Sequence, residues 1–255
     1  MEFIKITAQG NDYIYIDLRK GQFKGEISGE IVRRLSDRHF GIGSDGVVFL
    51  SESEEADIRM KMYNADGSVG KMCGNALRSV VYLLTQEKKQ EKYLVDTDSG
   101  RRKGWLETEP DIVKVSMGNI EQFDQTDDSE GSVFLVGIGN RHLVRIVEDL
   151  TAINVEEEVK IYRQEMAETD LNYEFAGVFG EDSLRIIIYE NGSGITLACG
   201  TGAVASAYTC RQEGLVNSDR IKVMMPGGEV IVEMGEDEIY LSGRVQEVFR
   251  GSIEI

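Results

Sequence analysis

Residues 72–75 read Met-Cys-Gly-Asn, and half a chain later residues 198–201 read Ala-Cys-Gly-Thr. Each motif follows a short extended run and opens a stretch of helical composition, over residues 74–86 and 200–212. A thiol at the start of a helix lies beside unpaired backbone N–H groups and the positive end of the helix dipole. This setting stabilises a thiolate and can bind an anion at the same time.

Other short motifs recur at the same distance along the chain. The matching pairs, in chain order, are Gly10-Asn11 with Gly139-Asn140, Gly67-Ser68 with Gly192-Ser193, Cys73-Gly74 with Cys199-Gly200, Ser99-Gly100 with Gly227-Gly228, and Met117-Gly118 with Ser242-Gly243. Their offsets all lie between 125 and 129 residues. Collinear matches at one period indicate a duplicated unit.

Each half therefore contains strand-like runs before and after one helix, which predicts two α+β domains of the same fold. The second helix is small or apolar nearly all round, so we expect it to be buried. We place the first domain at residues 1–121 and the second at 132–244, with the boundary in the polar stretch 122–131. The final segment, 245–255, is expected to return as a strand to the first domain.

Composition excludes several classes of partner. The formal net charge of the 255 residues is -17, which argues against nucleic acid and anionic membranes. The acidic runs, of which residues 156–158 are one, are interpreted as solvated surface. No apolar run approaches membrane length, and we expect a cytoplasmic protein. Three cysteines do not suggest a disulfide framework, and Cys210, inside the second helix, is expected to be a small buried hydrophobic residue.

Two equivalent thiols suit a symmetric reaction. If Cys73 and Cys199 face each other across a cleft, one thiolate can remove a proton from a carbon while the opposite thiol returns one, which inverts the configuration. A metal site is a weaker interpretation, because the chain has no Cys-x-x-Cys motif. No lysine lies in a recognisable motif for binding pyridoxal phosphate. A dithiol redox protein and a non-catalytic amino-acid-binding protein remain alternatives.

The sequence resembles the diaminopimelate epimerase family. The segments that carry the resemblance are Gly10-Asn11-Asp12-Tyr13, residues 37–43, Asn64-Ala65-Asp66-Gly67-Ser68, Met72-Cys73-Gly74-Asn75, Gly139-Asn140, Asn172, residues 197–202 and Pro226-Gly227-Gly228. The resemblance implies two pseudo-symmetric domains, each an antiparallel-rich sheet wrapped around a central helix. It also implies a cofactor-independent isomerase that acts on a small amino acid, and a homodimer.

The resemblance also implies roles for individual residues. Cys73 and Cys199 would be the two catalytic bases. The substrate-binding residues would be Asn11, Asn64, Gly74, Asn75, Asn140, Asn172, Glu190, Asn191, Gly200 and Thr201. Tyr13 is expected at most to form a wall of the pocket.

Two departures from the family pattern concern the substrate. Asn191 stands where the family has an arginine that binds the distal carboxylate of diaminopimelate, and asparagine cannot replace that contact. Arg141 follows Asn140 where the family has proline, and it could restore the lost charge. Lys71 also replaces a commonly acidic residue beside Cys73. We therefore expect a racemase for an amino acid other than diaminopimelate, such as histidine, with diaminopimelate epimerase as the alternative.

Overall fold

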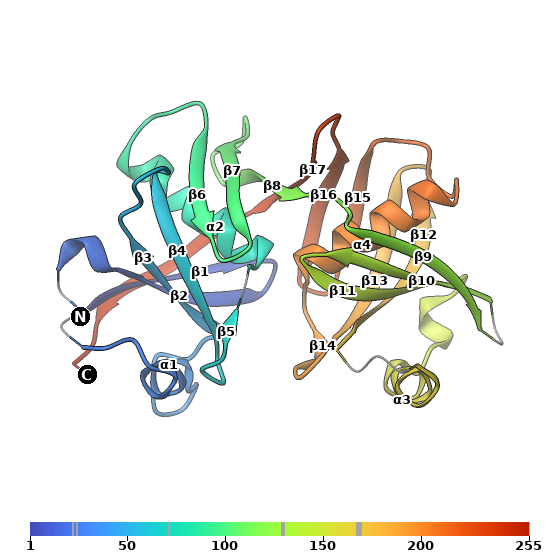
Figure 1. The fold of residues 1–255 in the computed structure, drawn as a ribbon, viewed down its shortest axis with the longest axis horizontal. Helices are drawn as coiled ribbons and strands as arrows, with labels where there is room; N and C mark the ends of the chain where they lie inside the picture. The colour runs from blue at the N-terminus through green and yellow to red at the C-terminus, as the bar shows by residue number, and fades with distance from the viewer. Residues whose placement is uncertain (22, 24, 71, 129–130, 167–169, 255) are drawn as a thin grey trace. The chain divides into compact units, whose positions relative to one another are not determined.

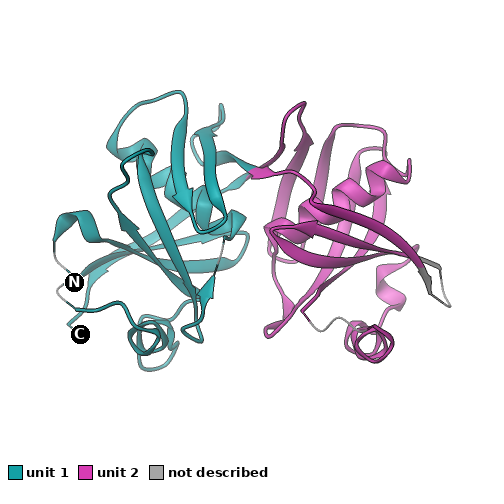
Figure 2. Ribbon diagram, in the orientation of Figure 1, with its two compact units in different colours: residues 1–116, 243–255 teal, residues 117–242 magenta. Residues whose placement is uncertain are grey.

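The chain divides into two compact units, which are drawn in different colours in Figure 2. The computed structural model describes residues 1–21, 23, 25–70, 72–128, 131–166 and 170–254. Unit 1 comprises Met1–Ser116 with Gly243–Ile255, and unit 2 comprises Met117–Ser242. The change of unit comes a few residues before the polar stretch 122–131, because residues 122–128 form a strand that pairs within unit 2.

Among its described residues, unit 1 consists of strands, two helices and one short 3-10 turn (Figure 1). Its elements are β1 (Glu2–Ala8), β2 (Asn11–Asp17), η1 (Leu18–Lys20), α1 (Gly29–Ser36), β3 (Gly46–Ser51), β4 (Ile58–Asn64), β5 (Val69–Gly70), α2 (Gly74–Glu87), β6 (Tyr93–Thr97), β7 (Gly100–Leu106), β8 (Ile112–Gly118) and β18 (Gln246–Ser252). The strands follow the order β18-β1-β2-β3-β4-β6-β7-β8, and β5 forms a hairpin with β4.

Unit 2 repeats this construction. Its elements are β9 (Gln122–Asp128), β10 (Gly131–Ile138), β11 (Asn140–Ile146), η2 (Leu150–Ala152), α3 (Val155–Glu165), β12 (Asn172–Gly180), β13 (Ser183–Glu190), β14 (Gly194–Thr196), α4 (Gly200–Gln212), β15 (Arg220–Met225), β16 (Gly228–Met234) and β17 (Ile239–Arg244). The strands follow the order β9-β10-β11-β12-β13-β15-β16-β17, and β14 forms a hairpin with β13.

The two strand orders correspond position by position, and the parallel pairs stand at the same positions in both. In unit 1 the parallel pairs are β2 with β3 and β4 with β6. In unit 2 they are β11 with β12 and β13 with β15. All other pairings used above are antiparallel where their register is defined. The predicted α+β fold, an antiparallel-rich sheet around a central helix occurring twice, is confirmed.

The central helix of each unit is enclosed by strands. Helix α2 contacts β1, β6 and β7, and its residues from Gly74 to Val81 are all buried. Gly104 of β7 allows this close approach, since a Cβ there would lie 2.8 Å from a methyl carbon of Val81. Helix α4 is buried along almost its whole length, as its small and apolar composition predicted.

A second helix lies on the outside of each sheet. Helix α3 begins at Asn154, whose side chain accepts a hydrogen bond from the backbone N–H of Glu157. The acidic run 156–158 occupies its first turn, where carboxylates interact favourably with the helix dipole. Val155, Val159 and Tyr162 pack this helix onto the core of unit 2.

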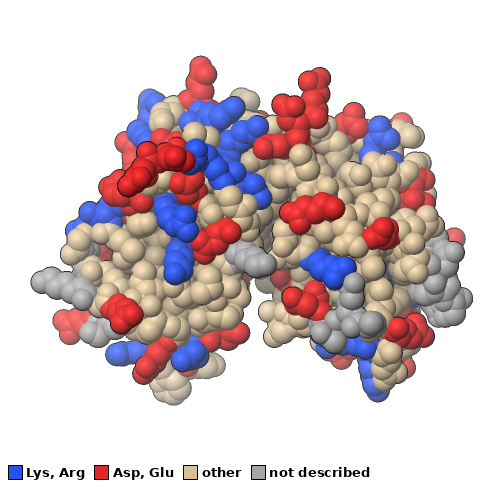
Figure 3. All heavy atoms as spheres, viewed as in Figure 1, with Lys and Arg blue, Asp and Glu red and all other residues tan. Residues whose placement is uncertain are grey.

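The surface carries charges of both signs. On the face drawn in Figure 3, lysine and arginine side chains of unit 1 lie next to aspartate and glutamate. Many of these neighbours form ion pairs, such as Arg59 with Asp98 and Lys88 with Asp57. Within the residues that the structure describes, none of the helices has both the length and the apolar character needed to span a bilayer.

Cys210 provides a test of the buried helix that leaves the other two cysteines untouched. It is fully buried on α4. We expect Cys210→Ala to lower the free energy of unfolding by about 1 kcal/mol, because the substitution leaves a small cavity. Urea denaturation measures this change. A loss within experimental error would contradict close packing around α4.

Candidate active site

Cys73 occupies the N-cap position of α2, at the point where β5 leads into the helix. Its backbone is extended, and its side chain forms no hydrogen bond that caps the helix. The hydroxyl of Tyr13, on β2, donates to the Cys73 Sγ over 3.5 Å. Burial, and then the neighbouring Cys73, raise the pKa of Tyr13 well above its usual value, so this phenol stays protonated and acts as a donor.

The other predicted residues of unit 1 lie on the elements around Cys73. Asn11 begins β2, and Asn64 ends β4, where its Nδ2 donates to Ser68 Oγ over 3.0 Å. Gly74 and Asn75 form the first turn of α2 and are buried. Lys71 lies outside the described residues.

A fully buried arginine lies one turn into the same helix. Arg78 Nη2 donates to Asn75 Oδ1 over 2.7 Å and to the side-chain oxygen of Gln9. Its Nε and Nη1 have no hydrogen-bond partner among the described residues. Burial lowers the pKa of Arg78 to about 10, while the adjacent Cys73 acts to raise it. The guanidinium is therefore still charged at neutral pH, and it favours negative charge on the neighbouring sulfur.

Cys199 occupies the equivalent N-cap position of α4. It is buried, and its Sγ lies 3.4 Å from the hydroxyl oxygen of Thr201. Glu190, at the end of β13, is a charged neighbour of this thiol and raises its pKa. Gly200 and Thr201, which were predicted to bind substrate, are both buried in the first turn of α4.

A buried histidine and glutamate lie beneath this helix. His142 on β11 and Glu174 on β12 are completely buried, and the His142 Nδ1 lies 2.7 Å from Glu174 Oε1. Gly202 of α4 leaves room for the carboxylate, because a Cβ at this position would lie 2.5 Å from Glu174 Oε1. A second carboxylate thus comes close to Cys199.

These neighbours disfavour a thiolate at Cys199. Burial first, and then the charges of Glu190 and Glu174, raise the pKa of Cys199 well above its usual value. The Thr201 hydroxyl and the Gly202 N–H act in the opposite direction but do not outweigh burial. Burial likewise raises the pKa of Glu190. The charged neighbours named for the two equivalent cysteines therefore differ in sign, with Arg78 beside Cys73 and Glu190 and Glu174 beside Cys199.

The remaining predicted residues lie around the turn that follows β13. The backbone N–H of Asn191 donates to Asn172 Oδ1 over 3.0 Å, and its Nδ2 donates to Asp170 Oδ1 over 3.0 Å. Asn191 Oδ1 accepts a hydrogen bond from Arg163 Nη2 over 3.2 Å. Asn140 begins β11 at an exposed position.

Arg141, which was expected to restore a positive charge near Asn191, and Arg163 have different hydrogen-bond partners. Arg141 donates to the side chain of Gln122 over 3.3 Å. Arg163, on α3, is the arginine that contacts Asn191.

Sequence reasoning missed four residues that the structure brings to these sites: Tyr13 as a partner of Cys73, Arg78, Glu174 and Arg163. The apolar residues around Arg78 in the stretch 76–84 could have singled it out, because a charged side chain is rarely buried in a helix unless it has a partner. For Arg163, the signal was the Asn154-x-x-Glu157 pattern that begins α3. Glu174 lies in an ordinary strand sequence and had no such signal.

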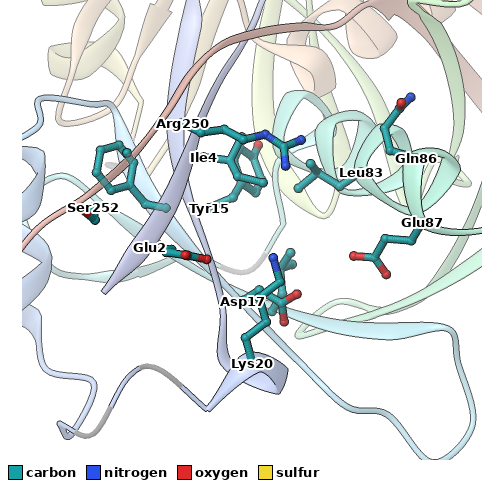
Figure 4. Close-up of a pocket in the computed structure, with 13 residues that line it drawn as sticks. Glu2, Ile4, Tyr15, Asp17, Lys20, Leu83, Gln86, Glu87, Arg250 and Ser252 are labelled. Carbon is teal, nitrogen blue, oxygen red and sulfur yellow. The ribbon is translucent and has the colours of Figure 1, made fainter.

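Unit 1 also contains a cavity, which is drawn in Figure 4. It has a volume of about 530 Å³ and is lined by residues that include Tyr15, Leu83 and Glu87. It adjoins the end of α2 opposite to Cys73, and a helix of 14 residues is about 20 Å long. Two of its carboxylates, Asp17 and Glu87, are bridged by Arg19. This cavity is therefore not part of the candidate site.

No group of three or more His, Cys, Asp and Glu side chains is arranged to hold a metal ion in the part of the chain that the structure describes. The three cysteines are free thiols.

Comparison with known proteins identifies the family. The profile of diaminopimelate epimerase matches residues 3–122 and 134–248. The diaminopimelate epimerase of Bacteroides thetaiotaomicron is 37% identical over 268 residues, which cover 100% of this chain and 98% of the relative. That of Acetivibrio thermocellus is 34% identical and covers 100% of this chain and 99% of the relative. That of Methanococcus maripaludis is 33% identical over the full length of both chains.

Solved structures of low identity share the fold. The phenazine biosynthesis protein of the PhzF family from Bacillus anthracis has a TM-score of 0.79 at 15% identity, covering 100% of this chain and 99% of that chain. A hydroxyproline epimerase from Agrobacterium vitis, solved with bound trans-4-hydroxy-L-proline, has a TM-score of 0.68 at 14% identity, covering 98% and 91%.

The family resemblance predicted from the two Cys-Gly motifs is thus confirmed, as is an enzyme of the amino-acid racemase and epimerase class. Over almost its whole length, this chain belongs to the diaminopimelate epimerase family.

Proposed function

We propose that Cys73 and Cys199 act on opposite faces of one amino-acid substrate and invert its α-carbon. The observation that carries this proposal is the equivalent placement of the two thiols, each at the N-cap of the buried central helix of its unit. One sulfur takes the α-proton as a base, and the electron pair of the broken C–H bond stays on the substrate. The opposite thiol then donates its proton to the other face of that carbon.

The backbone at both helix starts supports the same chemistry. The first N–H groups of a helix have no partner within the helix, and they carry the positive end of its dipole. In this proposal, Gly74 and Asn75 in the first turn of α2, and Gly200 and Thr201 in the first turn of α4, donate to the substrate α-carboxylate. Such donors stabilise the negative charge that develops when the α-proton leaves, and comparable donors contribute about 3–4 kcal/mol each.

The unequal surroundings of the two thiols give them different resting states in this proposal. Arg78 and the Tyr13 hydroxyl stabilise a thiolate at Cys73. Glu190, Glu174 and burial keep Cys199 protonated. The free enzyme then has one base and one acid, which is the combination that the first proton transfer needs. Cys73 starts the reaction in one direction, and the reverse direction requires the proton to be redistributed first.

Diaminopimelate is the substrate that the comparisons favour, because the relatives reported above are named diaminopimelate epimerase. Their identity of 33–37% extends over the whole chain. The sequence-based preference for histidine has no support from these relatives. Asn191 still favours a second candidate, an amino acid without a distal carboxylate, because this residue replaces a charged one.

Exchange of the substrate α-hydrogen in D₂O tests the reaction. With diaminopimelate, we expect the protein to incorporate deuterium at the α-carbon and to change its configuration, followed by NMR and chiral chromatography. Cys73→Ala and Cys199→Ala should each reduce inversion by at least about 1000-fold, because each removes one of two groups that act as a unit. Cys210→Ala is the matched control and should retain activity. Binding of diaminopimelate without α-exchange would instead support the non-catalytic alternative.

Alkylation of the thiols tests their resting states. At neutral pH, iodoacetamide should modify Cys73 faster than Cys199, because the thiolate is the reactive form and the raised pKa of Cys199 keeps it protonated. Raising the pH should narrow the difference. Mass spectrometry of peptides from the same protein gives both rates.

Alkylation of a protein variant tests the effect of the Glu190 charge on Cys199. Glu190→Gln removes a negative neighbour, so it should lower the pKa of Cys199 and increase its rate of alkylation relative to Cys73. Glu181→Gln, in an exposed turn of unit 2, is the control. Equal alkylation rates of the two thiols in the unmodified protein at neutral pH would contradict the assignment of a thiol at Cys199.

A further inference from the structure

An open depression lies on unit 2 at the turn that follows β13. Its volume is about 480 Å³, and it is lined by Arg163, Tyr189, Asn191, Gly192 and Gly194. Both glycines have positive φ, 82° and 78°, which glycine adopts without strain. Nothing lies within 4 Å of where their Cβ atoms would be, so the backbone forms this wall without side chains.

The guanidinium of Arg163 is held at this depression by two aromatic rings. Its Cζ lies 5.2 Å from the ring centre of Tyr189 and 5.9 Å from that of Tyr173. The two rings pack edge to face at 6.3 Å, which fixes the surface on which the cation lies. Arg163 extends from the last turn of α3.

Most of the hydrogen-bonding capacity of Arg163 remains available. A guanidinium has five N–H donors, and the hydrogen bond recorded for Arg163 goes to Asn191 Oδ1. Among the described residues, no carboxylate forms an ion pair with it. Asp170, the nearest acidic residue in this network, accepts from Asn191 Nδ2 instead.

The depression adjoins the proposed reaction site. Asn191 directly follows Glu190, whose charge acts on the Cys199 thiol. Consecutive Cα atoms are about 3.8 Å apart, so the turn that Arg163 contacts through Asn191 is continuous with the backbone of Glu190. The hydrogen bonds of Asn191 to Asn172 and Asp170 hold this turn in one conformation.

A carboxylate is the group that fits this arrangement. A planar guanidinium binds a carboxylate through two parallel charge-assisted hydrogen bonds, and an aromatic base limits the entropy lost on binding. The net charge of the chain is -17, so a substrate carboxylate that binds at this surface needs a local cation.

We propose that Arg163 binds the carboxylate at the end of the substrate remote from the reacting carbon, and thereby selects a dicarboxylic amino acid. This inference rests on the proposed function and specifies the substrate class of the same site. Arg163 supplies a positive charge at Asn191 from a different element, the helix α3. Arg163 is thus a specificity-determining residue, while the thiols carry out the chemistry.

Diaminopimelate and lysine are the matched pair of probes, because lysine has the same carbon skeleton without the second carboxylate. The test measures α-deuterium exchange of both compounds in D₂O with the unmodified protein and with Arg163→Gln. We expect the variant to lower the ratio of kcat/KM for diaminopimelate to that for lysine by roughly 10- to 100-fold, the effect of one charge-assisted contact. The change should be mainly in KM, because the distal contact is equally strong in the ground and transition states.

Arg185→Gln is the control. Arg185 is an exposed arginine of unit 2 that also lies over an aromatic ring, with its Cζ 4.2 Å from the centre of Phe179. Its substitution should leave the ratio unchanged. Arg163→Lys keeps the charge but not the planar fork, and should give an intermediate ratio. Thermal unfolding verifies that each variant is folded.

The outcomes separate this inference from the proposed function. An equal loss for both substrates in Arg163→Gln means that Arg163 only supports the turn, and it overturns the inference. Exchange of other amino acids but not of diaminopimelate also overturns it, while the two-thiol reaction stands. Absence of exchange with every amino acid overturns both.

Discussion

Enclosure of one helix by a curved sheet is the constraint from which the other features of each unit follow. A helix that contacts strands on several sides favours small or apolar residues there, as α4 carries along almost its entire length. Its N-terminal N–H groups are then the polar groups that need a partner. Cys73 and Cys199 occupy the N-cap positions, yet neither forms the side-chain hydrogen bond that a serine or aspartate would provide there. The helix start therefore combines a reactive sulfur with donors that suit an anionic ligand.

The duplicated fold does not impose equal chemistry on its halves. Unit 1 buries a guanidinium, Arg78, beside its thiol. Unit 2 instead buries the carboxylates of Glu174 and Glu190 beside Cys199, and pairs the first of them with His142. Equivalent backbone positions thus carry sulfurs with different proton affinities. A reaction that needs a base on one side and an acid on the other benefits from this difference.

Much of the fold could be predicted from local sequence. The boundaries of the helices after Cys73 and Cys199 agree with α2 and α4 to within one residue, because a buried helix has a composition unlike that of its flanking strands. The polar stretch 122–131, in which we placed the domain boundary, contains the strand β9, whose polar residues gave no sign of a strand at the edge of a sheet. The acidic run 156–158 was interpreted only as solvated surface, although its glutamates also stabilise the first turn of α3. Polarity alone does not distinguish a linker from a solvent-facing element.

The sequence by itself determined the duplication, the two thiols at helix starts and the family, because each depends on residues that are close together or repeat at a constant distance. The tertiary structure alone decided the surroundings of those thiols. Arg163 and Asn191 are 28 residues apart, and His142 and Glu174 are 32 apart. Their contacts arise from the packing of a helix against a sheet and from the pairing of β11 with β12. Charge, burial and hydrogen bonding at a sulfur depend on such distant neighbours, which no local pattern specifies.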